Sequence, residues 1–236
     1  MSAVLTPPEA PTAPIIPMPP ETPVAPALAA EQRIVLRDVS WATYEQLLHN
    51  YQDKSSPRFT YDKGTLEILM PSRTHEATSR FFEVFVSAIV EERDLEVHSI
   101  GSTTNRREDL QRGAEPDTGF YLQNAGLVPS EGDIDLNVYP PPDLVVEIDV
   151  TSPSLDKFPI YAEIGVPEIW RYVVKNDLVT IFLLQAGKYV TATESLALPP
   201  VTAEILMRFL QASRRTKRRS AWLRELRAWL RETASA

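Results

Sequence analysis

The segment PPDLVVEIDVTSPS, residues 141–154, constrains the fold more than any other part of the sequence. Its centre, residues 144–150, is almost entirely apolar and β-branched, which is typical of a strand buried on both faces of a sheet. Glu147 and Asp149 interrupt this run, and because side chains alternate along a strand, both acids project from the same face. A buried carboxylate is costly unless a cation meets it, so these acids require a counter-charge.

The remaining patterns predict a sheet covered by helices. A helix is expected at 41–50, capped by Ser40, and a hairpin at 58–70 that turns at Asp62-Lys63-Gly64. A stripe of Phe, Val and Ile predicts a long helix from 75 to 93. Further elements are a helix at 155–164 and strands at 95–101, 115–122, 142–150, 167–174 and 178–185. The expected fold class is α/β or α+β, with a mixed β-sheet flanked by helices.

Composition excludes several kinds of site. The sequence has no cysteine, which rules out disulfides, thiolate zinc sites and a cysteine nucleophile, and which is compatible with a reducing cytoplasm. The three histidines, His49, His75 and His98, are too scattered to suggest a multi-histidine metal site. No apolar run approaches the roughly 20 residues of a membrane span, and the N-terminus lacks a signal-peptide pattern. We therefore expect a cytoplasmic protein with no membrane partner.

Three regions are expected along the chain. Residues 1–30 hold nine of the 21 prolines and predict a disordered leader, residues 31–200 form the main domain, and residues 201–236 form a helical tail. The charge is divided unevenly among them. Residues 204–232 contain nine Lys or Arg and three Glu, a net charge of +6. The whole chain has a net charge of −8, so the rest of it carries −14. The body is acidic and the tail is basic.

The tail predicts an amphipathic helix as a C-terminal extension of the fold. Trp222, Leu226 and Leu230 recur at spacings of four residues, with arginines at many of the other positions. Such a helix packs its apolar face on its own domain or on a second subunit. Two alternatives are a contact with nucleic acid through the arginines and binding to a membrane surface.

A second acidic segment, GAEPDTGFYL, carries Glu115 and Asp117. An aspartate on a neighbouring strand can converge on Glu147 and Asp149, and such a like-charged cluster cannot stay fully ionised without a counter-charge. A hard divalent cation, Mg²⁺ or Mn²⁺, is the obvious one. We therefore expect the loss of one acid to relieve repulsion in the metal-free protein. The alternative is that one acid caps a turn and the others lie at solvent-facing strand ends.

The run PPDLVVEIDVTSPSLDKFPIYAEIGVPEIWRY, with the earlier EPDTGFYL, resembles the Uma family (Uma two) of restriction-endonuclease-like proteins, a branch of the PD-(D/E)XK nuclease superfamily. The resemblance extends over residues 38–195. It implies a nuclease core in which Asp117 and Glu147 hold a divalent metal, and we expect Asp149, on the same face of the strand as Glu147, to be a further ligand. The superfamily's usual Glu-X-Lys would place its lysine at position 149, which is Asp149 here. Lys157, at the start of the next helix, is therefore the matching lysine.

The resemblance implies that DNA is the partner and that Lys157 stabilises charge developing on the phosphate during hydrolysis. Glu76, in the first turn of the long helix, is a further candidate because the superfamily often has an acid there, and the alternative is that it complements the helix N-terminus. Tyr161 and Trp170 are expected to be core or wall residues. Ser152 and Ser154 are expected to cap a helix, because no histidine is placed to activate them.

Two functions follow from these observations. The first is a Mg²⁺-dependent endonuclease that hydrolyses DNA phosphodiester bonds. The second is a catalytically inactive nuclease-fold module for binding or assembly, for which a homodimer is one arrangement. The acidic body opposes contact with DNA, which presents a dense row of negative charge, so the position of the basic tail helps to distinguish the two.

Overall fold

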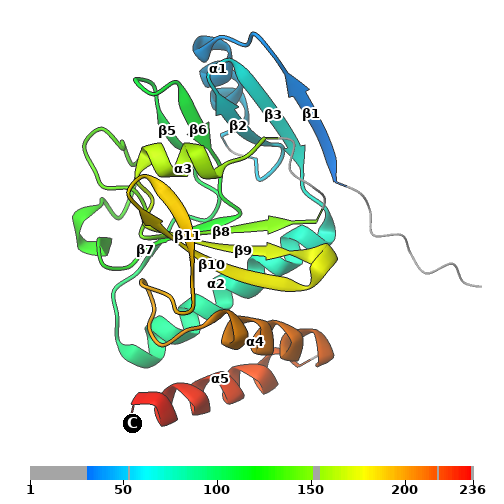
Figure 1. Cartoon of the computed structure of the whole chain (residues 1–236), viewed down its shortest axis with the longest axis vertical. Helices are drawn as coiled ribbons and strands as arrows, with labels where there is room; N and C mark the ends of the chain where they lie inside the picture. Colours follow the sequence, from blue (N-terminus) through cyan, green and yellow to red (C-terminus); the bar gives the residue numbers. More distant parts are fainter. Residues whose placement is uncertain (1–30, 53, 151–154, 217, 235–236) are drawn as a thin grey trace, which may run out of the picture.

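The computed structural model is shown in Figure 1. It describes residues 31–52, 54–150, 155–216 and 218–234. The proline-rich leader expected over residues 1–30 lies outside the described residues, and so do Ser152 and Ser154. None of the described helices is long and apolar enough to cross a membrane.

The described strands form two sheets. Sheet A has the order β1-β3-β2-β6-β5, and sheet B has the order β11-β10-β9-β8-β7-β4. Sheet B is mixed because β8 and β9 run parallel, whereas its other neighbouring strands are antiparallel. The strands are β1 (Gln32–Leu36), β2 (Arg58–Asp62), β3 (Thr65–Met70), β4 (His98–Ser99), β5 (Asn105–Arg107), β6 (Arg112–Ala114), β7 (Thr118–Tyr121), β8 (Leu144–Asp149), β9 (Glu168–Val173), β10 (Leu178–Gln185) and β11 (Lys188–Ala192).

Helices flank both sheets. They are α1 (Trp41–Tyr51), α2 (Arg73–Arg93), α3 (Phe158–Ile164), α4 (Ala203–Arg215) and α5 (Arg219–Ala234), with short 3₁₀ turns η1 (Ala125–Leu127) and η2 (Val174–Asn176). The Ser40 side chain caps α1 by accepting a hydrogen bond from the Thr43 amide at 3.1 Å. The Ser72 side chain caps α2 in the same way, accepting from the His75 amide at 3.2 Å. The expected class, a mixed sheet flanked by helices with a C-terminal helical extension, is confirmed.

Strand β8 separates two apolar layers, because its residues point alternately to the two faces of sheet B. Val146 and Ile148 belong to the core shared with α2, which runs below sheet B in Figure 1. Val145 belongs to the core shared with α3, which lies on the opposite face of the sheet. Glu147 has the same parity as Val145, so its carboxylate lies on the α3 side.

The structure differs from the sequence-based expectation mainly in sheet A. The hairpin β2–β3 is as predicted, with Lys63 and Gly64 at φ values of 46° and 90° in its turn. Strands β1, β5, β6 and β11 were not expected. Strands β5 and β6 have three residues each and are rich in Arg and Gly, so they lack the apolar alternation by which strands are recognised.

The tail completes the principal core. Helix α5 packs against α2 with Trp222, Leu226 and Leu230 buried, and the ring centroids of Phe81 and Trp222 are 5.2 Å apart. The predicted apolar stripe is therefore confirmed, and it packs on the chain's own body. Because α4 and α5 share this core, the division of the chain at residue 200 stays a prediction.

Replacing Leu226 tests this packing. Leu226→Ala is expected to lower the free energy of unfolding by about 2–5 kcal/mol, because it leaves a cavity at a fully buried position. Arg224→Ala is the control, because this exposed residue is on the same helix, and it should change stability by less than about 0.5 kcal/mol. Urea denaturation measures both. Equal effects would contradict the packing of α5.

Candidate active site

Asp117 lies between the two sheets, directly before β7. Its amide donates to the Val146 carbonyl at 3.1 Å, which fixes it beside β8. One carboxylate oxygen, Oδ2, accepts from the Ile148 amide at 2.5 Å. The other, Oδ1, accepts from His75 Nε2 at 2.7 Å and from the Arg58 guanidinium. Burial opposes ionisation of this carboxyl, but the charges around it, His75 foremost, hold its pKa well below the usual range.

His75 bridges two carboxylates. Its Nδ1 lies 2.5 Å from Glu31 Oε1, and its Nε2 faces Asp117. Burial alone would lower the pKa of His75, but the charge of Asp117 and the hydrogen bonds to Asp117 and Glu31 raise it to about 9. The imidazole is therefore protonated at neutral pH and donates from both nitrogens.

Glu147 is held by two donors from the start of α3. Its Oε2 accepts from Lys157 Nζ at 2.8 Å, and its Oε1 accepts from the Tyr161 hydroxyl at 2.6 Å. Lys157 Nζ also donates to the Glu115 carbonyl at 2.8 Å, which anchors the ammonium group beside Asp117. Burial raises the pKa of Glu147 to about 7, with Lys157 acting in the opposite direction.

Asp149, at the end of β8, has a separate partner on β9. Its Oδ2 accepts from both Nε and Nη2 of Arg171 at 2.6 Å. In the parallel register Glu147 is paired with Arg171. The arginine side chain extends diagonally to Asp149, which lies two residues farther along β8 on the same face. Burial raises the pKa of Asp149, and the charge of Arg171 acts against this rise.

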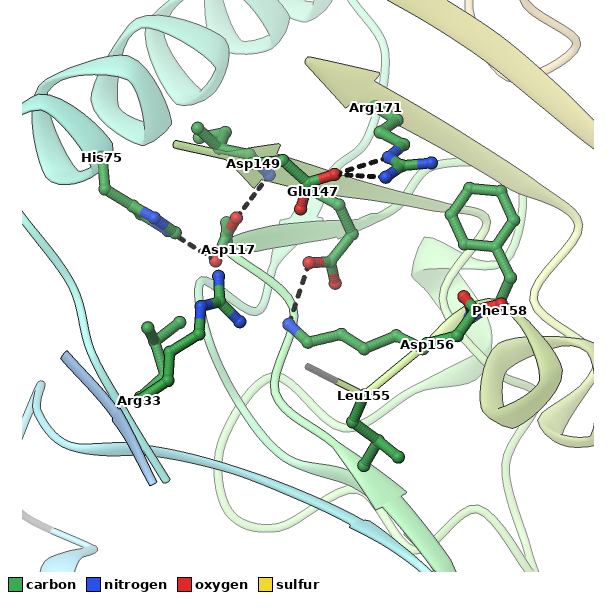
Figure 2. A pocket seen from close by; sticks show the side chains of 12 residues that line it. Arg33, His75, Asp117, Glu147, Asp149, Leu155, Asp156, Phe158 and Arg171 are labelled. Carbon is green, nitrogen blue, oxygen red and sulfur yellow. Dashed lines mark hydrogen bonds and ion pairs between the residues drawn. The ribbon is translucent and has the colours of Figure 1, made fainter. Parts of the chain in front are cut away.

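These groups surround one small pocket (Figure 2). Asp117, Glu147, Asp149 and Lys157 all line it, as the sequence predicted for the convergence of the acids. Its free space is about 30 Å³, which holds about one or two water-sized species. The pocket therefore suits a hydrated ion or one phosphate oxygen and excludes a large organic ligand.

Glu76 is not in the lining of the pocket, but it is linked to Asp117 through Arg58. It accepts from Arg58 Nη2 at 2.7 Å, and Arg58 in turn pairs with Asp117. Its side chain is 37% exposed and stands in the first turn of α2, where a negative charge also complements the helix N-terminus. The contact with Arg58 fits a supporting role behind the site. The position in the first turn of α2 fits the alternative, a charge that complements the helix N-terminus.

The expectation of a like-charged acidic cluster is wrong. Asp117 is neutralised by Arg58 and His75, while the other two acids pair with Lys157 and Arg171 respectively. Arg58, His75 and Arg171 come from other elements, so the pattern around β8 could not reveal them, whereas Lys157 was expected at the site but as a partner of the phosphate. Loss of one acid therefore removes an ion pair from a cation of the chain instead of relieving repulsion.

One acid does have the turn-capping role that was considered as an alternative. Asp143, just before β8, accepts from the amides of Leu122 and Asn124 at 2.7 and 3.0 Å and from the Asn124 side chain at 2.6 Å. Trp170 is a core residue, as expected, and its indole Nε1 donates to Glu168 at 2.5 Å.

Sequence reasoning missed several groups at the site. Arg33, on β1, lines the pocket with an 11% exposed side chain that pairs with both Glu31 and Glu67 at 2.9 Å. It lies in a strand that the pattern did not predict. Tyr161 was assigned to the core, although its position one helical turn after Lys157 is a signal that both face Glu147.

The donor set has the chemistry of a site for a hard cation. Carboxylate oxygens are the ligands that Mg²⁺ and Mn²⁺ prefer, and those of Asp117, Glu147 and Asp149 line one pocket. Among the residues that the structure describes, no three Asp, Glu or His side chains are arranged to hold an ion. The carboxylates are oriented toward their own cations, so binding of a metal requires them to exchange ion pairs.

Comparison with known proteins identifies the family. Residues 41–212 match the model of the Uma2 family, described as "Putative restriction endonuclease", and the chain belongs to this family. Among solved structures, it is similar to one described as a putative nuclease belonging to DUF820 from Anabaena variabilis ATCC 29413. The identity is 16%, the TM-score is 0.44, and the match covers 69% of this chain and 98% of that chain. No curated protein matches the chain.

Asp117→Asn tests the ion-pair network. The substitution should lower the free energy of unfolding by about 3–5 kcal/mol, because Arg58 and His75 stay buried and each loses one of its two carboxylate partners. Asp149→Asn should cost less, because its partner Arg171 is 34% exposed and can be solvated. Both are measured by urea denaturation in EDTA. A stable Asp117→Asn protein would show that the acids repel one another after all.

Proposed function

We propose that the chain is a metal-dependent endonuclease that hydrolyses DNA phosphodiester bonds. The observation that carries this proposal is that Asp117, Glu147, Asp149 and Lys157 line one pocket, although they come from three separate segments of the chain. The resemblance to the PD-(D/E)XK superfamily assigns Asp117 and Glu147 to metal binding and Lys157 to the phosphate. The chain's membership of the Uma2 family supports the same class of activity.

Each residue has a role in this proposal. Asp117, Glu147 and Asp149 would hold Mg²⁺ or Mn²⁺, which when bound supplies a Lewis acid for the phosphate oxygen and lowers the pKa of coordinated water. Lys157 would pair with the charge that develops on the phosphate. Tyr161 orients Glu147 through its 2.6 Å hydrogen bond. The ammonium of Lys157 lies 2.8 Å from Glu147, so a phosphate that approaches the carboxylates also approaches the lysine.

A second candidate function is an inactive nuclease-fold module for binding or assembly, in which a homodimer would be one arrangement. The observation that favours it is that each proposed metal ligand already pairs with a cation of the chain. A closed network of this kind is stable without a metal. Asp149 also occupies the position where the superfamily usually has its lysine.

Cleavage of supercoiled plasmid in Mg²⁺ or Mn²⁺ distinguishes the two functions. The wild-type protein should nick the plasmid, and Lys157→Met should lower the rate by about 100-fold or more, because the developing phosphate charge loses its partner. Lys157→Met should still bind Mn²⁺ in calorimetry, whereas Glu147→Gln should not. Lys188→Met, at an exposed residue of β11, is the matched control and should cleave normally.

Two results would contradict the proposal. Cleavage by Lys157→Met at the wild-type rate would remove the lysine from the reaction. Binding of metal by the wild-type protein without cleavage of any DNA would favour the inactive module.

A further inference from the structure

The turn between α4 and α5 gathers arginines at one corner of the molecule. Arg214 and Arg215 end α4, and Arg218 and Arg219 stand at the start of α5. All four side chains are exposed. We call these residues the basic corner. The first three turns of α2 add two exposed arginines, Arg73 and Arg80.

Contacts place this corner beside the first turns of α2. Arg214 binds Asp177 Oδ1 at 2.8 Å and the Tyr172 hydroxyl at 2.7 Å, so the end of α4 is fixed to β9 and η2. The rings of Phe81 and Trp222 are in contact, which fixes the start of α5 against α2 next to Arg80 in the sequence. A groove of about 530 Å³ lies between α2 and the end of α4. Its polar lining consists of Arg73, Thr74, Thr78, Tyr172, Asp177, Ser213 and Arg214.

The arginines of the corner differ from those farther along α5. Arg227 and Arg231 are engaged with Glu91 and Glu92 at the other end of α2. Among the residues that the structure describes, Arg215, Arg218 and Arg219 have no carboxylate within salt-bridge distance, and the same is true of Arg73 and Arg80. Five like charges in one region repel one another, and a polyanion is the partner that reverses this cost.

The groove and the pocket open near the same end of sheet B. Arg73 and Thr74 line the groove, and His75, the next residue of α2, lines the pocket. On β9, Tyr172 lines the groove while its neighbour Arg171 lines the pocket and holds Asp149, so the two sites lie on opposite faces of sheet B and meet around the end of this strand. Figure 1 shows the end of α4 on the same side of the molecule as the end of β8. A chain of phosphates that enters the pocket can therefore continue over the first turn of α2.

We propose that the basic corner and the groove beside it bind the sugar-phosphate backbone of the nucleic acid whose phosphate enters the pocket. This inference rests on the proposed function. Guanidinium groups bind phosphates bidentately, and the Thr74 hydroxyl, which also lines the groove, adds a hydrogen-bond donor. The surface supplies the positive charge that the acidic body lacks. The corner lies beyond residue 212, where the match to the family model ends.

Fluorescence anisotropy with a short labelled DNA duplex in EDTA tests the surface. The triple variant Arg215→Gln, Arg218→Gln, Arg219→Gln should bind at least about tenfold more weakly at low salt. The slope of log K against log salt should fall by about 2–3, because each phosphate contact contributes about 0.9. The corresponding lysine variant should retain most of the affinity, because its charge is kept.

The matched control removes the same number of positive charges from positions farther along α5. Arg224→Gln, Arg227→Gln, Arg231→Gln should bind the duplex within about twofold of wild type. Equal loss in the two triple variants would overturn the proposal, because net charge alone would then account for binding. Tighter binding of the full chain to vesicles of anionic lipid than to DNA would also overturn it. The assay contains no divalent cation, so its outcome is independent of whether the protein cleaves.

Discussion

The rest of the structure depends on the buried carboxylate of Asp117 and the two cations that hold it. Arg58 begins β2 in sheet A, His75 stands in the first turn of α2, and the amide of Ile148 belongs to β8 in sheet B. One side chain therefore joins both sheets and the central helix. Ser79 adds to this joint by donating to the Asp117 carbonyl at 2.8 Å. Burial of this ionised carboxylate is favourable only because the geometry of these three elements is maintained. The same contacts therefore stabilise the site and the fold.

Much of the fold could be predicted from local patterns. The apolar run of β8, the Gly64 hairpin and the stripe of α2 each depend on residues close in sequence, and they form as expected. The amphipathic tail was recognised for the same reason. Sheet A was missed in part because β5 and β6 are short and lack an apolar pattern of their own, β6 being held by pairing with β2 and β5 by pairing with β6. Such strands exist only through tertiary contacts.

The acids of the site could be found from the sequence, but of their cationic partners only Lys157 could. Periodicity along β8 places Glu147 and Asp149 on one face, and the family motifs add Asp117 and Lys157. The cations Arg58 and Arg171 come from other strands, and no local signal marks them as partners of these acids. Because only the acids were visible in these segments, the sequence led to the prediction that a metal ion is their counter-charge. The structure instead contains a balanced network, in which a metal must compete with cations of the chain itself.

This competition is the central claim, and a calorimetric titration with Mn²⁺ tests it most directly. Arg171→Gln removes the cation that holds Asp149 and leaves the contacts of Asp117 in place. If the carboxylates of this pocket are metal ligands in exchange with their ion pairs, the wild-type protein binds Mn²⁺ and Arg171→Gln binds it more tightly, by about tenfold for each 1.4 kcal/mol of pairing released. Absence of Mn²⁺ binding by both proteins, or identical affinities, would contradict the account and leave the acids with a purely structural role.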